Sequence, residues 1–128
     1  MLKNYNMINK LIIDNYNFAE NTFSYMYKYK QFVDSKLLNE LINIIAKEAL
    51  KTDNDNRIEI IKYIFSIYSS FALCTILFLN NHPIERFDNF NDFEFDYMYR
   101  FRNIINLILV NDKEGLLNYE DDLGKLNL

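Results

Sequence analysis

The chain has 128 residues, a length typical of one domain, and half of them are apolar, which is enough for a hydrophobic core. Two glycines and one proline are too few for the turns of a β-sandwich or barrel, or for a glycine-rich phosphate loop. A single cysteine excludes an intrachain disulfide, and one histidine with one cysteine cannot by themselves form a zinc site.

Apolar residues recur at helical spacing in the first half of the chain. The spacing predicts an amphipathic helix over 2–14, which the polar run at 15–17 ends. Segment 18–33 also fits a helix, although its alternating aromatic residues fit a β-hairpin as well. Asp34 or Ser35 is a good N-cap for a helix over 36–51.

The second half begins with a polar turn at 52–56 and a long helix over 57–79, which the residues before Pro83 end. Its stretch 63–79 carries no charge, which touches the lower limit for a membrane-spanning helix. Three serines, a threonine and two tyrosines within it, and the lack of a flanking basic cluster, favour a core helix instead. We expect this helix to be central and buried on nearly all sides.

The remaining pattern predicts one helical turn at 84–87, a strong helix over 93–110 and a short helix over 113–123. Gly124 would mark the C-terminal end of the last helix. With no linker or repeat along the chain, we expect one all-α domain over 1–128, a bundle of five or six helices around the apolar central helix.

The net charge of −4 is unevenly spread. The first 51 residues are slightly basic, whereas acidic residues gather in two later runs, Glu85 to Asp96 and Asp112 to Asp122, each with one basic residue. Phosphate repels such a protein, so nucleic acid is a poor partner. A basic protein surface is a better one.

The residues that could carry chemistry have structural interpretations. His82 suits the negative end of a helix dipole, and Cys74 lies in the most apolar stretch, where a thiol is a small hydrophobic group rather than a nucleophile. Asp92 and Asp96 stand one helical turn apart, but acidic runs are commonly solvated faces, and neither run matches a calcium loop. An enzyme would need a carboxylate–metal site that nothing else supports, so we expect no catalytic residue, no metal and no cofactor.

Segment 88–102, DNFNDFEFDYMYRFR, alternates acidic and aromatic residues too closely for all the aromatics to share one helical stripe. Exposed aromatics beside charges are typical of binding hot spots. The alternative is a linking segment whose aromatics all tuck under the bundle. The predicted partner-binding surface comprises Asp88, Phe90, Asp92, Glu94, Phe95, Asp96, Tyr99, Glu120, Asp121 and Asp122.

In overall character the chain resembles the bacterial immunity proteins that neutralise secreted or contact-delivered toxins. Asn, Ile, Phe, Lys and Tyr, whose codons are AT-rich, supply 66 of the 128 residues, and such proteins are small, often acidic and encoded in AT-rich cassettes. The resemblance implies a protein that binds a basic nuclease-like toxin domain and occludes its active site. It implies no particular residue. Because the N-terminus has no apolar secretory segment, we expect a cytoplasmic protein.

A second resemblance is to the viral Bcl-2-like proteins, in which amphipathic helices surround an apolar one. It implies a hydrophobic groove that takes a partner helix. The chain lacks the Asn-Trp-Gly-Arg motif of the cellular family, since it has no tryptophan. The sequence leaves the partner's identity and the oligomeric state open.

Overall fold

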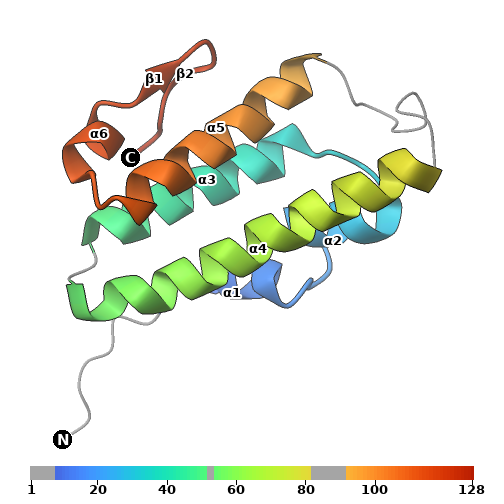
Figure 1. The fold of residues 1–128 in the computed structure, drawn as a ribbon, viewed down its shortest axis with the longest axis horizontal. Helices are drawn as coiled ribbons and strands as arrows, with labels where there is room; N and C mark the ends of the chain where they lie inside the picture. Colours follow the sequence, from blue (N-terminus) through green and yellow to red (C-terminus); the bar gives the residue numbers. More distant parts are fainter. Residues whose placement is uncertain (1–7, 52–53, 82–91) are drawn as a thin grey trace, which may run out of the picture.

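The computed structural model describes residues 8–51, 54–81 and 92–128. Within them the chain forms six helices and one two-stranded hairpin (Figure 1). The elements are α1 (Lys10–Tyr16), α2 (Phe23–Lys30), α3 (Ser35–Lys51), α4 (Asn54–Asn81), α5 (Asp92–Leu109), α6 (Lys113–Leu117), β1 (Glu120–Asp121) and β2 (Gly124–Lys125). The predicted all-α bundle of five or six helices is therefore confirmed.

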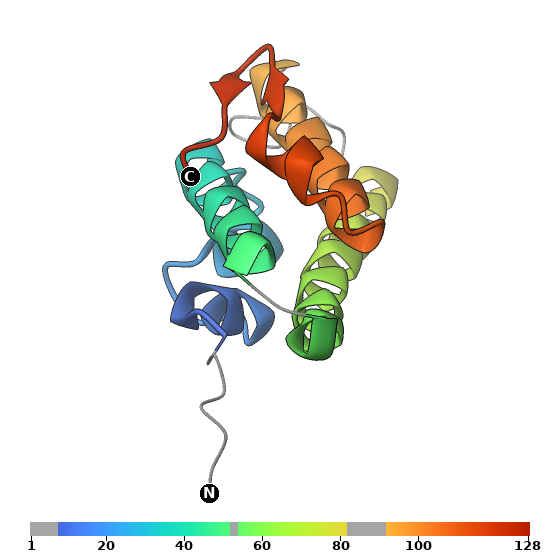
Figure 2. The ribbon, with the colours of Figure 1, turned by 90° about the vertical axis from the view of Figure 1, so that its left-hand side faces the viewer.

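The helix at the centre of the bundle is α3, which packs against all five other helices. Figures 1 and 2 show it alongside α5. The Asp34 carboxylate accepts a hydrogen bond of 3.0 Å from the Leu37 amide, so Asp34 caps the start of the helix. Five apolar side chains of α3 are completely buried: Leu38, Leu41, Ile42, Ile45 and Ala46.

Helix α4 buries only one face. Ile60, Ile64, Ile67 and Phe71 follow one another at helical spacing and lie in the core. The most apolar part of the segment Arg57–Leu77 is long and apolar enough to cross a membrane, yet only 17% of it is buried. The prediction of a central helix buried on nearly all sides is therefore wrong. Large apolar residues of α4 itself occur on its outward side as well as on its core side. Hydropathy along the sequence therefore does not indicate which side lacks a neighbouring helix.

Aromatic side chains join α2, α4 and α5 in the core. Phe71 is 8% exposed, and its ring centre lies 4.7 Å from that of Tyr27, 5.4 Å from Phe23 and 6.4 Å from Phe101. The Tyr27 hydroxyl shares a 2.5 Å hydrogen bond with Thr75 Oγ1. Burial raises the pKa of Tyr27 to about 12, and the bond to Thr75 opposes only part of that rise.

The aromatic segment that fitted either a helix or a hairpin is helical over Phe23–Lys30. Thr22 caps it, because its hydroxyl accepts a hydrogen bond of 3.1 Å from the Tyr25 amide. Phe23 and Tyr27, four residues apart, point into the core. Helical spacing therefore sorts the aromatics better than strand alternation does.

Helix α1 occupies the end of the predicted 2–14 helix, and residues 1–7 lie outside the described part. Asn15, expected to break it, lies within it and is almost fully buried. The side-chain oxygen Oδ1 of Asn15 accepts hydrogen bonds of 3.0 Å from both the backbone amide and the hydroxyl of Ser24. Its side-chain nitrogen Nδ2 donates a hydrogen bond of 2.9 Å to the Leu11 carbonyl. Asn15 thus ties α1 to α2.

The last predicted helix, over 113–123, is wrong beyond its first turns. Helix α6 ends at Leu117, and Glu120–Asp121 pairs antiparallel with Gly124–Lys125. Gly124 has a φ of 102° and belongs to the hairpin, not to a helix end. The other expected element of this half, the turn at 84–87, lies outside the described residues.

Among the residues that the structure describes, four other than glycine adopt left-handed backbone conformations. They are Phe18, Asn21, Gln31 and Asn111, with φ between 52° and 67°. Gln31 caps the C-terminal end of α2, a position that helices commonly give to glycine. The chain has only two glycines for such positions.

Candidate functional site

The residues of the predicted binding surface fall into three groups. Two lie outside the described residues: Asp88 and Phe90. Three lie in the first turn of α5, where the backbone alone is described: Asp92, Glu94 and Phe95. Five are fully described: Asp96, Tyr99, Glu120, Asp121 and Asp122.

On α5, Asp96 is exposed and the Tyr99 side chain is 55% exposed, so both are accessible to a partner, as the predicted binding surface requires. The guanidinium carbon of Arg102 lies 5.3 Å from the centre of the Tyr99 ring, within cation–π range. Asp96 precedes Arg100 by one helical turn, so it lies on the side of α5 that Arg100 presents to the hairpin.

Arg100 joins α5 to the C-terminal hairpin. It is 2% exposed, and its Nε donates a hydrogen bond of 2.9 Å to one carboxylate oxygen of Asp121 while an Nη donates to the other. Its remaining donors reach the Gly124 carbonyl at 2.5 Å and the Asn39 side chain of α3 at 3.2 Å. This bidentate pair, whose guanidinium is almost fully buried, holds the hairpin against α5 and α3.

The Asp121 carboxylate is fully engaged within the molecule. It also accepts hydrogen bonds of 2.9 Å from the Tyr119 hydroxyl and from the Leu123 amide. Burial alone would raise the pKa of Asp121, but the hydrogen bonds from Arg100, Tyr119 and Leu123 outweigh it, so the pKa lies below its usual value. Asp121 therefore holds the hairpin to α5, and its carboxylate remains 24% exposed.

The ion pair has a consequence for its neighbours. Glu120 and Asp122 flank Asp121 and are exposed, while Asp121 itself is bonded to Arg100 of α5. The ion pair thus joins the two elements that carry these acidic residues, Asp96 on α5 and Glu120 and Asp122 on the hairpin. Figure 1 shows the hairpin beside α5. We call Asp96, Tyr99, Glu120 and Asp122 the acidic surface.

An open groove adjoins the acidic surface between α5 and the segment from α6 to β1. Its lining is rich in amides, and it shares Glu120 with the acidic surface. The lining residues are Asn103, Asn106, Leu107, Val110, Gly115, Asn118, Tyr119 and Glu120. Amide side chains both donate and accept hydrogen bonds, which suits the backbone of a bound protein segment.

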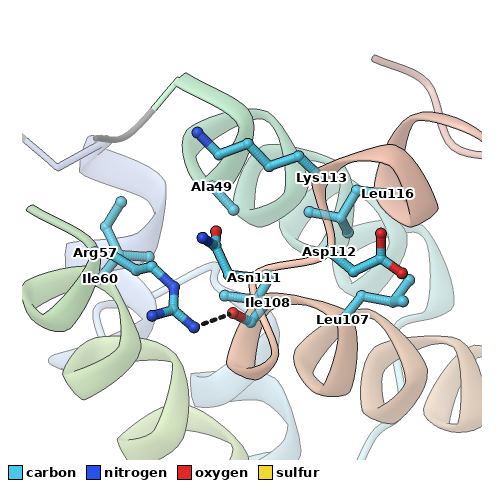
Figure 3. A pocket seen from close by; sticks show the side chains of 9 residues that line it. All are labelled: Ala49, Arg57, Ile60, Leu107, Ile108, Asn111, Asp112, Lys113 and Leu116. Atoms are coloured by element: carbon cyan, nitrogen blue, oxygen red, sulfur yellow. Dashed lines mark hydrogen bonds between the residues drawn. The ribbon is translucent and has the colours of Figure 1, made fainter. Parts of the chain in front are cut away.

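A smaller pocket at the C-terminal end of α5 is structural (Figure 3). Arg57 lies over the end of α5, where it donates hydrogen bonds to the carbonyls of Ile108 at 3.0 Å and Leu109 at 2.6 Å. A cation at this position satisfies the last carbonyls and opposes the helix dipole. The pocket has room for about one water molecule, too little for a substrate.

The other candidate chemical groups form no site in the described residues. Burial raises the pKa of the half-buried Cys74 thiol, and the nearby Lys28 opposes only part of that rise. His82 lies outside the described residues. Within the described ranges, no group of three or more histidine, cysteine, aspartate or glutamate side chains is placed to hold a metal ion.

No relative identifies the chain. Comparisons with protein families, with curated proteins and with solved structures found no match. The function therefore has to be argued from the residues and the geometry alone.

Sequence reasoning missed Arg100 and the amide groove. Arg100 could have been suspected, because it stands among Tyr97, Phe101 and Ile104 at helical spacing, where an apolar residue is expected. Its partner Asp121 is 21 residues away, beyond the reach of helical periodicity. Nothing local indicates that Asn103, or the other amides, line a groove.

Proposed function

We propose that this protein is a small binding protein that captures a basic protein domain on the acidic surface and blocks that domain's active site. The observation that supports it most is the Arg100–Asp121 pair, because it joins α5, which carries Asp96, to the hairpin, which carries Glu120 and Asp122. A basic surface that has evolved to bind phosphate is complementary to such carboxylates.

Charge alone would steer the encounter without making the complex long-lived, since exposed ion pairs contribute little. Tyr99 supplies a second kind of contact. It is half exposed beside Asp96, on a helix whose other face is packed in the core. An aromatic ring that becomes desolvated at the centre of an interface typically slows dissociation.

Within this proposal the partner is a toxin domain of the nuclease kind, and the protein acts in the cytoplasm as its immunity protein. The chain's small size, acidity and AT-rich composition support this. The alternative, a Bcl-2-like protein, depended on a helix enclosed on all sides. The one-sided packing of α4 among the described residues does not favour that alternative.

The test uses the protein encoded beside this one in the genome, with binding measured by surface plasmon resonance. The variant Asp96→Asn/Asp122→Asn removes one charge from each element of the acidic surface. Its matched control, Glu20→Gln/Glu59→Gln, removes two exposed charges elsewhere and has the same net charge. We expect the first variant to slow association about tenfold or more, and the control to differ little from the wild type.

The aromatic contact is tested separately with Tyr99→Ala, which should speed dissociation with little change in association. Tyr29→Ala, at a similarly exposed tyrosine on α2, is its control. Equal association rates for the two charge variants, or a partner whose contact face is acidic, would contradict the proposed function.

A further inference from the structure

The outward face of α4 is an apolar surface that no described element covers. Figure 2 shows α4 at the edge of the bundle. Four large apolar side chains of this face, Ile58, Phe65, Leu73 and Ile76, are 57–68% exposed, whereas the opposite face lies in the core. They offer roughly 400–500 Å² of apolar area, as much as the largest patches of monomeric proteins, about 300–600 Å².

The spacing along this face is that of a coiled-coil seam. Six residues of this face are spaced alternately four and three residues apart. In a helix that pairs with another helix, residues at this spacing stay on the side that faces the partner. The seam consists of Ile58, Lys62, Phe65, Ser69, Ala72 and Ile76. Five of the six are exposed and Ala72 is half-buried.

We propose that α4 is the interface of a symmetric homodimer, in which it packs antiparallel against α4 of a second copy along this seam. A two-fold axis beside Ile67 places Ile58 opposite Ile76 of the other copy. In the same register Phe65 lies opposite Ser69, and Lys62 lies opposite Ala72. Each large side chain then meets a small one, except at the two ends, where isoleucine meets isoleucine.

This pairing of sizes favours one register over its neighbours. A shift by one heptad toward the start of α4 would set Phe65 against Lys62, bring Ala72 opposite Asp55 and leave Ile76 without an opposite residue on the helix. The Lys62 side chain is largely exposed, so its stem can cover Ala72 while its ammonium group stays in water. A polar residue at one seam position is a common way to fix a register.

The area also suits a second copy. Two such faces bring together roughly 800–1,000 Å² of apolar area, close to the size of the smallest specific interfaces, about 1,000 Å². The acidic surface stays uncovered, because it lies on α5 and the hairpin. This inference therefore does not rest on the proposed function.

The test is the mass of the full chain in solution, by light scattering after size exclusion and by sedimentation equilibrium. We expect the wild type at micromolar concentrations to have twice the 15.5 kDa mass of one chain. Phe65→Lys should weaken the dimer about tenfold or more, because it sets two new charges near the axis. Val110→Lys, at an equally exposed apolar position outside α4, should leave the dimer intact. Far-ultraviolet circular dichroism and thermal unfolding check that both variants fold.

A size exchange tests the register itself. Phe65→Ser and Ser69→Phe should each weaken the dimer, whereas the double variant Phe65→Ser/Ser69→Phe should restore it, since each large side chain again meets a small one. A monomeric wild type, or a dimer that Phe65→Lys leaves unchanged, would overturn the proposal. So would a monomeric wild type that instead sediments with phosphatidylcholine vesicles, which would assign the face to a membrane.

Discussion

Arg100 and Asp121 form an ion pair whose two side chains differ in their exposure to solvent. The Arg100 guanidinium is almost completely buried, while the Asp121 carboxylate is 24% exposed. If Asp121 loses its charge, a buried cation is left without its counter-ion, which costs more than the loss of one hydrogen bond.

The variant Asp121→Asn should therefore lower the free energy of unfolding by about 2–4 kcal/mol. Urea unfolding followed by circular dichroism measures it. Asp122→Asn, at the adjacent exposed carboxylate, should change stability by less than about 0.5 kcal/mol. Equal effects of the two substitutions would mean that the pair contributes nothing beyond a surface charge.

The same pair predicts a dependence on acid. The pKa of Asp121 in the folded protein lies below its usual value. Its contribution to stability is therefore complete above the unfolded pKa, about 3.9, and is lost as the pH falls through the lower folded pKa. Denaturant unfolding of the wild type and of Asp121→Asn between pH 6 and pH 2 should show the difference between them shrink toward the acid end. A constant difference across that range would contradict this.

On the scale of a helix, α4 offers two phenylalanines in opposite surroundings. Phe71 lies among four aromatic rings and is 8% exposed, whereas Phe65 is 60% exposed. Phe71→Ala should lower the free energy of unfolding by roughly 3–5 kcal/mol. Phe65→Ala should lower it by less than about 1 kcal/mol when measured at high dilution, where no dimer contributes. Thermal and urea unfolding of both variants checks this, and similar losses would mean that α4 is packed on both sides.

The helices themselves could be predicted from the sequence because each of the long ones has a strong local pattern. The predicted limits of α3, α4 and α5 lie within about three residues of those observed, since caps such as Asp34 and apolar spacing act over a few residues. The direction in which α4 faces solvent was not predicted, because large apolar residues such as Phe65 and Ile76 share the outward side with Lys62 and Ser69.

Part of the candidate site, the residues on α5, could be predicted because helical periodicity is a local pattern. Exposure of Asp96 and Tyr99 follows from their places on α5, which the local pattern indicates. The hairpin has strands of only two residues and depends on Arg100, so it has no period of its own to detect. The pairing of Asp121 with Arg100 could not be predicted, because a sequence shows which residues are charged but not which distant charges meet in the fold.

For the whole molecule, net charge and its distribution set how the protein meets a partner. If the acidic surface steers association, the association rate should fall markedly between about 20 mM and 150 mM salt, because charges more than about 8 Å apart are then screened. The dissociation rate should change little. Stopped-flow kinetics with the partner at several salt concentrations measures both, and an association rate insensitive to salt would show that the acidic surface does not steer.

Residues in the left-handed backbone conformation lower the stability of this fold below what glycine at the same positions would allow. Gln31 pays a steric penalty at the end of α2 that glycine would avoid, although glycine also makes the unfolded chain more flexible. Gln31→Gly should therefore raise the melting temperature by about 2–4 °C, measured by differential scanning calorimetry. A fall would show that the Gln31 side chain contributes more than its backbone costs. Phe18 is strained in the same way, whereas Asn21 and Asn111 are of the residue type that tolerates this conformation best after glycine. A version of the chain with glycine at Phe18 and Gln31 would therefore tolerate heat, and further mutation, better than this chain does.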